Sequence, residues 1–103
     1  MDDLHSNSEI YTTLSAILVE ALRVDRSKIN LNSKIFNDLG AESIDILDIR
    51  FRVEEAFAFK IEQEEIVRSL GEGLTARQFQ ENFTVGSLVG FIKDRLVQKE
   101  RAI

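Results

Sequence analysis

The chain has 103 residues, with no cysteine, proline or tryptophan, one histidine and a formal net charge of −5. This length suits a single domain. The absence of cysteine excludes disulfides, thiolate nucleophiles and cysteine-ligated metals, and one histidine leaves little material for a histidine relay or metal cluster. Because nucleic-acid binding needs clustered lysine and arginine, the acidic balance argues against it. We therefore expect no catalytic residue, no metal site and no nucleic-acid partner.

The start of the chain carries no targeting signal that we recognise. Its first six residues, MDDLHS, are acidic and polar, unlike the basic and apolar start of a secretory signal. No apolar run approaches the length that spans a bilayer. We expect a cytoplasmic protein without an integral membrane segment.

Hydrophobic periodicity predicts a first helix over residues 10–22, followed by a long connection. Ser6 and Glu9 form a capping-box pattern just before this helix. The connection, residues 24–40, is rich in turn-forming residues but also contains Ile29, Leu31, Ile35, Phe36 and Leu39. We expect this loop to lie on the core and to end in a turn at Gly40, where glycine permits a positive φ.

The rest of the chain predicts two further main helices and one or two short ones. A second helix is expected from Ser43 to Phe57, and a short one over 62–69. Thr75 and Gln78 form another capping-box pattern, for a short helix that ends near residue 82. The last helix begins near Thr84, and its apolar face is Val85, Leu88, Val89, Ile92 and Leu96. The fold class is all-α: a small four-helix-type bundle with three main helices and a long first loop.

The second helix has two apolar faces. Its core face is predicted to be Ile46, Ile49, Val53, Ala56 and Phe57, and its second face is Ile44, Leu47 and Phe51. A surface helix normally needs one apolar face, so the second must be covered. Either residues 71–83 fold over it, or it is an exposed strip on which partners dock.

The acidity of the chain is concentrated around this helix. Residues 36–65 contain nine acidic and three basic side chains, a net charge of −6, so the remainder carries +1. A patch of one sign steers partners of the opposite sign, although acidic runs are often only solvated surface. Arg50 and Arg52 are expected beside the acidic strip.

Residues 37–45, NDLGAESID, resemble the Asp-Leu-Gly-x-Asp-Ser-Leu motif of acyl carrier proteins. The resemblance continues through the helix that follows and resumes at residues 83–92, FTVGSLVGFI, which are similar to the last helix of that family. It implies that Ser43 carries 4′-phosphopantetheine, attached covalently by a separate enzyme from coenzyme A. The thiol of that group holds acyl chains as thioesters. Since a helix N-terminus favours a phosphodiester, the position of Ser43 suits this role.

The sequence departs from the family pattern at several places. Glu42 stands where the family usually has Asp, and Ile44 replaces the usual Leu. Residues 71–83 look like an insertion before the last helix, which resembles a longer subgroup that serves very-long-chain fatty acids for lipid A. The seven phenylalanines either line a wide acyl cleft or simply fill the core. We expect one acyl-carrier-like domain over 1–103, with flexible tails at 1–7 and 98–103.

The resemblance implies a carrier in fatty acid or lipid biosynthesis that is not itself an enzyme. Its partners would be a phosphopantetheinyl transferase and acyl-loading and acyl-transferring enzymes, and we expect a monomer. The residues expected to recognise partners are Glu42, Ile44, Asp45, Leu47, Asp48, Phe51, Glu54 and Glu55. Two alternatives stay open: a carrier of aminoacyl or peptidyl cargo, and an acidic interaction module in which Ser43 is only a helix N-cap.

Overall fold

The computed structural model describes residues 6–71 and 73–101, of which only the backbone is described at 63, 67, 70, 100 and 101. Five α-helices follow one another: α1 (Asn7–Leu22), α2 (Ser43–Phe57), α3 (Gln63–Leu70), α4 (Ala76–Asn82) and α5 (Val85–Arg101). A single 3₁₀ turn, η1 (Arg26–Lys28), lies in the first connection. No strand forms within the described ranges, where one isolated bridge joins Lys34 and Thr84. The predicted all-α bundle with three long and two short helices is confirmed.

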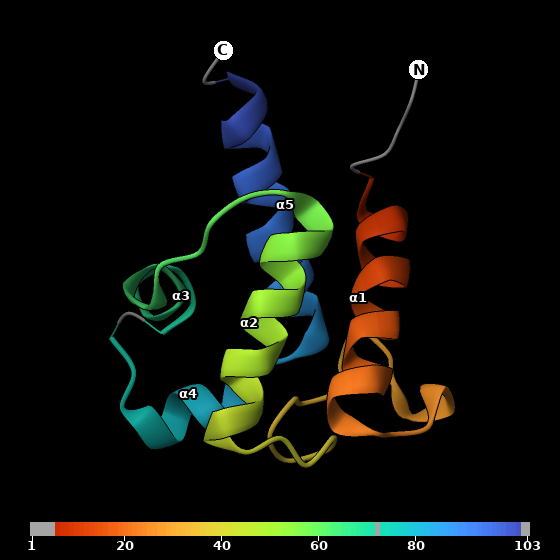
Figure 1. Cartoon of the computed structure of the whole chain (residues 1–103). Coiled ribbons are helices and arrows are strands. Elements are labelled where there is room, and N and C mark those ends of the chain that lie inside the picture. The colour runs from red at the N-terminus through yellow and green to blue at the C-terminus, as the bar shows by residue number, and fades with distance from the viewer. Residues whose placement is uncertain (1–5, 72, 102–103) are drawn as a thin grey trace.

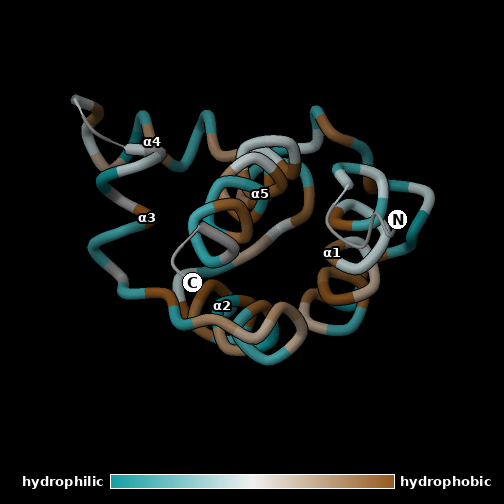
Figure 2. Tube along the Cα trace, turned by 90° about the horizontal axis from the view of Figure 1, so that it is seen from above, coloured by the Kyte–Doolittle hydropathy of each residue, from teal (hydrophilic) through white to brown (hydrophobic). Residues whose placement is uncertain are grey.

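The three long helices surround one apolar core. α1 packs against both α2 and α5, and α3 packs against α5. Figure 1 shows that α2 and α5 run opposite to α1, so α2 begins at the end of the bundle away from the start of α1 and the end of α5. Seen from above in Figure 2, α3 and α4 lie together on the side of the bundle away from α1. The predicted face of α5 is confirmed, because its five members are all buried: Val85, Leu88, Val89, Ile92 and Leu96.

The expected core face of α2 is correct except at one position. Ile49 and Val53 are buried, and Ile46 and Phe57 are partly buried against the core. Ala56 is exposed, so its assignment to this face was wrong. Two caps predicted from sequence also form: Ser6 Oγ accepts from the Glu9 amide at 3.1 Å, and α4 has the complete Thr75–Gln78 capping box.

The long first connection lies on the core, as its apolar content predicts. Ile29, Ile35 and Leu39 are buried, whereas Leu31 is 52% exposed and does not join them. Main-chain hydrogen bonds join this connection to the start of α5. The Ile35 amide donates to the Phe83 carbonyl and the Val85 amide to the Ser33 carbonyl, each at 2.9 Å.

The connection between α2 and α3 is tied to both of its neighbours. The Ile61 amide donates to Glu54 Oε2 of α2 at 2.7 Å, and Lys99 Nζ of α5 donates to the Ala58 carbonyl at 2.6 Å. Arg95 of α5 pairs with Glu65 of α3. These contacts hold α3 against α5, beside α2.

The phenylalanines do not line one wide cleft. Phe36, Phe79 and Phe83 form one group near α4, and Phe57 and Phe59 stack at the opposite end of α2. Of the expected tails, 1–5 and 102–103 lie outside the described residues, while Asn7 and residues 98–101 belong to α1 and α5.

Candidate functional site

The chain enters α2 through a turn that is held firmly on both sides. Asp38 Oδ2 accepts a hydrogen bond from the Lys34 amide at 2.8 Å. Gly40 has a φ of 75°, as its identity predicts, and it lies between the buried side chains of Leu39 and Ala41. Because these two apolar residues are anchored in the core, the direction in which the next residues leave the turn is set by the fold.

The first helical residue of α2 is Ser43, and the cap is Glu42. The Glu42 carbonyl accepts from the Asp45 amide at 2.9 Å, and the Glu42 amide donates to Asp45 Oδ2 at 2.8 Å. Ser43 is therefore not the N-cap, and the N-cap role that the interaction-module alternative gave it was wrong. Glu42 holds the capping position instead, because the carboxylate of Asp45, at the third helical position, reaches back to the Glu42 amide.

The hydroxyl of Ser43 is exposed and makes no hydrogen bond to any described residue. The amides of Ser43 and Ile44 also meet no acceptor within the described part of the chain, as expected in the first turn of a helix. Free amide groups and the helix dipole favour a phosphate group at this position. The residues present thus fit a serine-linked phosphodiester.

The second apolar face of α2 is open to solvent. Ile44 is 72% exposed, Leu47 47% and Phe51 54%, so the described residues of the segment, 71 and 73–83, do not cover them. The α4 segment instead packs through Phe79 on Phe83, with ring centroids 4.9 Å apart. We call these three residues of α2 the exposed strip.

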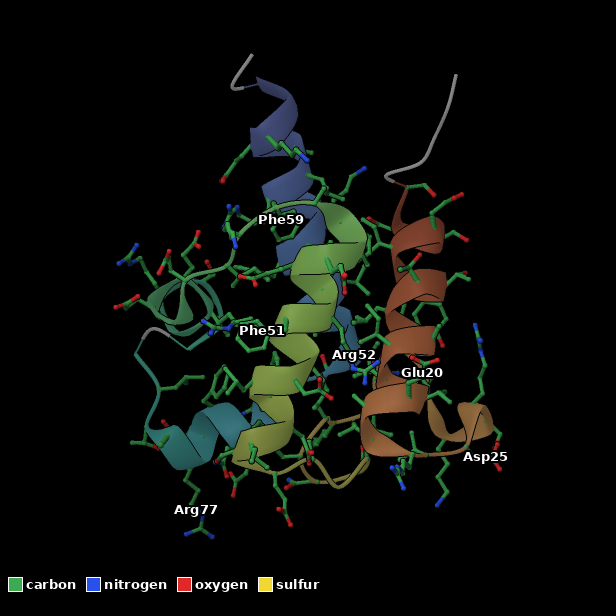
Figure 3. All side chains as sticks on the ribbon, viewed as in Figure 1. Glu20, Asp25, Phe51, Arg52, Phe59 and Arg77 are labelled. Carbon is green, nitrogen blue, oxygen red and sulfur yellow. The ribbon has the colours of Figure 1, made fainter. Side chains whose placement is uncertain are left out.

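The carboxylates beside the exposed strip differ in the hydrogen bonds and ion pairs that they make. Asp48 pairs with Arg52 at 3.1 Å, and Arg52 also reaches Glu20 of α1 at 3.0 Å. Figure 3 shows Arg52 and Glu20 pointing toward each other between α2 and α1. Glu54 accepts from the Ile61 amide. Glu42 and Glu55 are exposed at opposite ends of the helix. The structure therefore presents Glu42 and Glu55 to a partner most directly, and it uses Asp48 and Glu54 in its own contacts.

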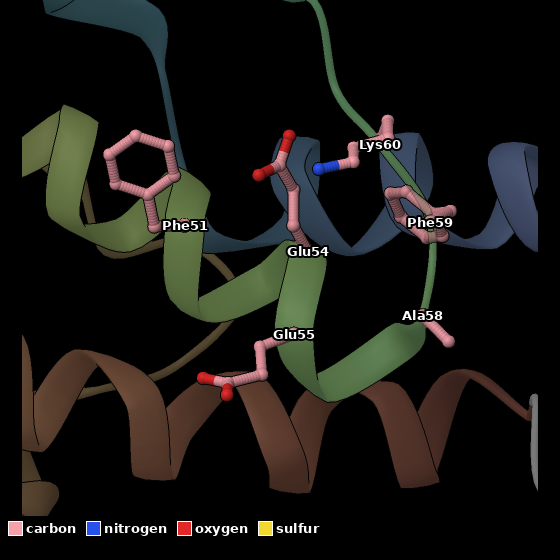
Figure 4. A pocket seen from close by; sticks show the side chains of 6 residues that line it. All are labelled: Phe51, Glu54, Glu55, Ala58, Phe59 and Lys60. Carbon is pink, nitrogen blue, oxygen red and sulfur yellow. The ribbon is translucent and has the colours of Figure 1, made fainter.

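An open groove of about 460 Å³ lies at the far end of the same helix (Figure 4). It is lined by Phe51, Glu54, Glu55, Ala58, Phe59 and Lys60. The groove extends the exposed strip past the end of α2. It places two carboxylates and an ammonium group at the edge of an apolar surface.

Arg50 lies against the exposed strip, as expected, with its guanidinium carbon 5.2 Å from the centroid of the Phe51 ring. It also lines a small cavity of the bundle, which was not expected. The signal was present in the sequence, because Arg50 follows Ile46 by four residues and so shares its face of the helix.

The described residues contain no group of three or more His, Asp or Glu side chains that could hold a metal. Within the same residues, no helix is long and apolar enough to cross a membrane.

Known proteins are similar to this chain over most of its length. Residues 12–72 match the phosphopantetheine attachment site family. An acyl carrier protein of Borrelia garinii subsp. bavariensis is 35% identical over 86% of this chain and 95% of the relative. The protein named acyl carrier protein AcpXL from Brucella melitensis is 30% identical over 90% of this chain and 98% of the relative. A Thermotoga maritima acyl carrier protein is 29% identical over 88% of the chain. With its helical bundle and the exposed serine at the start of α2, the chain belongs to the acyl carrier protein family and carries 4′-phosphopantetheine.

Proposed function

We propose that Ser43 is the attachment residue and that the chain delivers acyl groups to enzymes of fatty acid or lipid biosynthesis. The observation that carries this proposal is that the Ser43 hydroxyl and the amides of Ser43 and Ile44, at the start of α2, make no hydrogen bond to any described residue. When bound, the phosphopantetheine group supplies a terminal thiol on which acyl chains are held as thioesters.

The attachment step needs a base from another protein. No His or Lys lies within six residues of Ser43 in the sequence, and its hydroxyl meets no described acceptor. The Ser43 oxygen would form a bond to the phosphorus of coenzyme A nearest the pantetheine. The adenosine bisphosphate leaves with the electron pair of the broken phosphoanhydride bond, and the serine proton passes to the transferase. The first-turn amides and dipole of α2 stabilise the phosphodiester that remains.

The exposed strip and its carboxylates are proposed as the surface that partner enzymes recognise. Ile44, Leu47 and Phe51 provide apolar area that can be buried at the centre of an interface. Glu42, Asp45, Asp48, Glu54 and Glu55 provide a rim of negative charge for basic partner surfaces. These partners include the phosphopantetheinyl transferase and the acyl-loading and acyl-transferring enzymes. The chain itself acts as a carrier and not as an enzyme, and we propose a cytoplasmic monomer.

The proposal is tested by incubating the protein with coenzyme A, magnesium and a broad-specificity phosphopantetheinyl transferase. Intact mass should rise by one phosphopantetheine in the unaltered protein and in Ser69→Ala, which changes another exposed serine. It should not rise in Ser43→Ala. A folded protein that gains no mass would favour the interaction module without a prosthetic group. A gain that survives Ser43→Ala would place the attachment elsewhere.

A further inference from the structure

A small cavity lies inside the bundle between α2, α3 and α5. Its volume is about 10 Å³, which is room for one water molecule at most. The described residues that line it are Ile35, Ile46, Ile49, Arg50, Val53, Ile61, Ile66, Phe83 and Leu88. Arg50 is thus the one polar side chain among these nine.

The guanidinium of Arg50 is only partly satisfied. One terminal nitrogen donates to the Ile61 carbonyl at 3.3 Å, and the group lies 5.2 Å from the centroid of the Phe51 ring. Its Nε is buried and has no hydrogen-bond partner among the described residues. Because nearly all buried donors in proteins are bonded, an unpaired one beside a cavity calls for an explanation.

Arg52, two residues later on the same helix, is a useful comparison because its guanidinium has acceptors. Its Nε donates to Asp48 and its Nη1 to Glu20, both on the surface between α1 and α2. Arg50 lies on another side of the helix, with its guanidinium over the Phe51 ring, and there its buried Nε has no hydrogen-bond partner among the described residues. A buried water would also be poorly held there, because it needs two to four polar partners and the cavity offers one.

We propose that Arg50 recognises an oxygen atom on the acyl chain, so that this carrier shelters hydroxy- or keto-acyl chains in preference to saturated ones. The inference rests on the proposed attachment at Ser43. The chain oxygen accepts a hydrogen bond from the Arg50 Nε, and the apolar walls of the cavity contact the hydrocarbon on either side of it. A saturated chain would have to fill the same space and leave the donor unpaired.

The geometry of α2 places Arg50 close to the point at which the phosphopantetheine arm that carries the acyl chain would leave Ser43. Seven residues separate them, which is about 10 Å along the helix axis. Ile46 and Ile49 lie on α2 between these two levels and also line the cavity. Since the cavity is too small for an acyl chain, it must widen to admit one. α3 packs on α5 through the Arg95–Glu65 pair, so a chain enters between α2 and α3.

The experiment compares two acyl chains of equal length on the full protein. The transferase loads octanoyl- or 3-hydroxyoctanoyl-phosphopantetheine from the corresponding coenzyme A ester, and intact mass verifies each product. The hydroxylated form should unfold at a temperature about 4–8 °C above the octanoyl form. Equal temperatures, or a more stable octanoyl form, would overturn the inference. If no mass is gained in the loading step, the attachment proposal fails and this inference fails with it. The mass measurement comes before the melting curves, so the two failures can be told apart.

Two variants separate the role of Arg50 from a general effect of charge on α2. Arg50→Met keeps an unbranched side chain as far as the position of the Nε and removes the donors, so the difference between the two acyl forms should vanish or reverse. Arg52→Met removes an arginine that faces the surface, so the difference should persist. A difference that survives Arg50→Met would contradict the assignment.

A second measurement needs no apolar variant to fold. In a nitrogen-15 spectrum of the arginine Nε–H groups, the Arg50 signal is assigned by its absence from Arg50→Lys. Loading the unaltered protein with 3-hydroxyoctanoyl should shift this signal and slow its exchange with water, whereas octanoyl should not. A signal that responds equally to both chains would show that Arg50 senses occupation of the cavity and not the oxygen.

Discussion

The turn before Ser43 depends on the backbone of Gly40, with its φ of 75°. A Cβ added at Gly40 would meet no atom within 4 Å, so Gly40→Ala should be penalised only through the backbone. We expect the free energy of unfolding in urea to fall by about 1–2 kcal/mol. Gly90→Ala is the matched control, because Gly90 lies inside α5 with equally open surroundings. There the same change should stabilise by about 0.5–1 kcal/mol. If Gly40→Ala were as stable as Gly90→Ala, the positive φ at position 40 would carry no penalty for a residue with a Cβ, and the account of the turn would be wrong.

At the same scale, the sequence located the start of α2 but not the role of each residue there. Ser43 is a residue type that commonly caps helices, and it was the natural candidate. The cap is decided instead by a contact three residues apart, in which Asp45 accepts from the Glu42 amide. Because Ser43 is not the cap, its hydroxyl is not used in a capping hydrogen bond, and a free hydroxyl is what attachment requires.

At the scale of the element, α2 has one face for the fold and another for partners. Ile49 is 3% exposed and Leu47, two residues earlier, is 47% exposed. Ile49→Ala should lower the free energy of unfolding by about 2–5 kcal/mol. Leu47→Ala should change it by less than about 0.5 kcal/mol and yet slow modification by the transferase. Chemical denaturation and transferase kinetics check both. Unchanged kinetics in Leu47→Ala would remove this position from the docking surface.

Periodicity predicted the helices well because burial imposes it. The five predicted residues of the α5 face are all buried, and the bounds predicted for α2 are those observed. It failed at Ala56, which is exposed although it was expected on the core face, and it did not show that Arg50 lines a cavity of the bundle. A helical wheel gives the angle of a residue, whereas the shape of the neighbouring α3 and α5 decides how far round the helix the core extends.

At the scale of the whole molecule, the −6 charge of residues 36–65 should govern how fast basic partners arrive. Glu55→Lys should lower kcat/KM for modification about 2–5-fold at low salt. Asp25→Lys makes the same change of charge on the far side of α1, away from α2 (Figure 3), and should have little effect. The difference between the two should shrink at about 1 M salt, where the Debye length is only about 3 Å. Equal effects would mean that only net charge matters.

Long-range placement was the part of the fold that local patterns could not supply. Arg95 of α5 pairs with Glu65 thirty residues away, and Lys99 with the Ala58 carbonyl forty-one residues away. Such pairs depend on where α3 settles. The sequence pattern predicted that Ile35 and Leu39 lie on the core, yet it could not show that Leu31 stays outside.

The central claim, that Ser43 carries the prosthetic group, is tested most directly by locating the added mass on a peptide. Trypsin cleaves after Lys34 and Arg50, and the released peptide of residues 35–50 contains a single hydroxyl side chain, that of Ser43. After treatment with coenzyme A and transferase, this peptide should carry one phosphopantetheine and every other peptide should be unmodified. An unmodified 35–50 peptide beside a modified peptide elsewhere would contradict the claim.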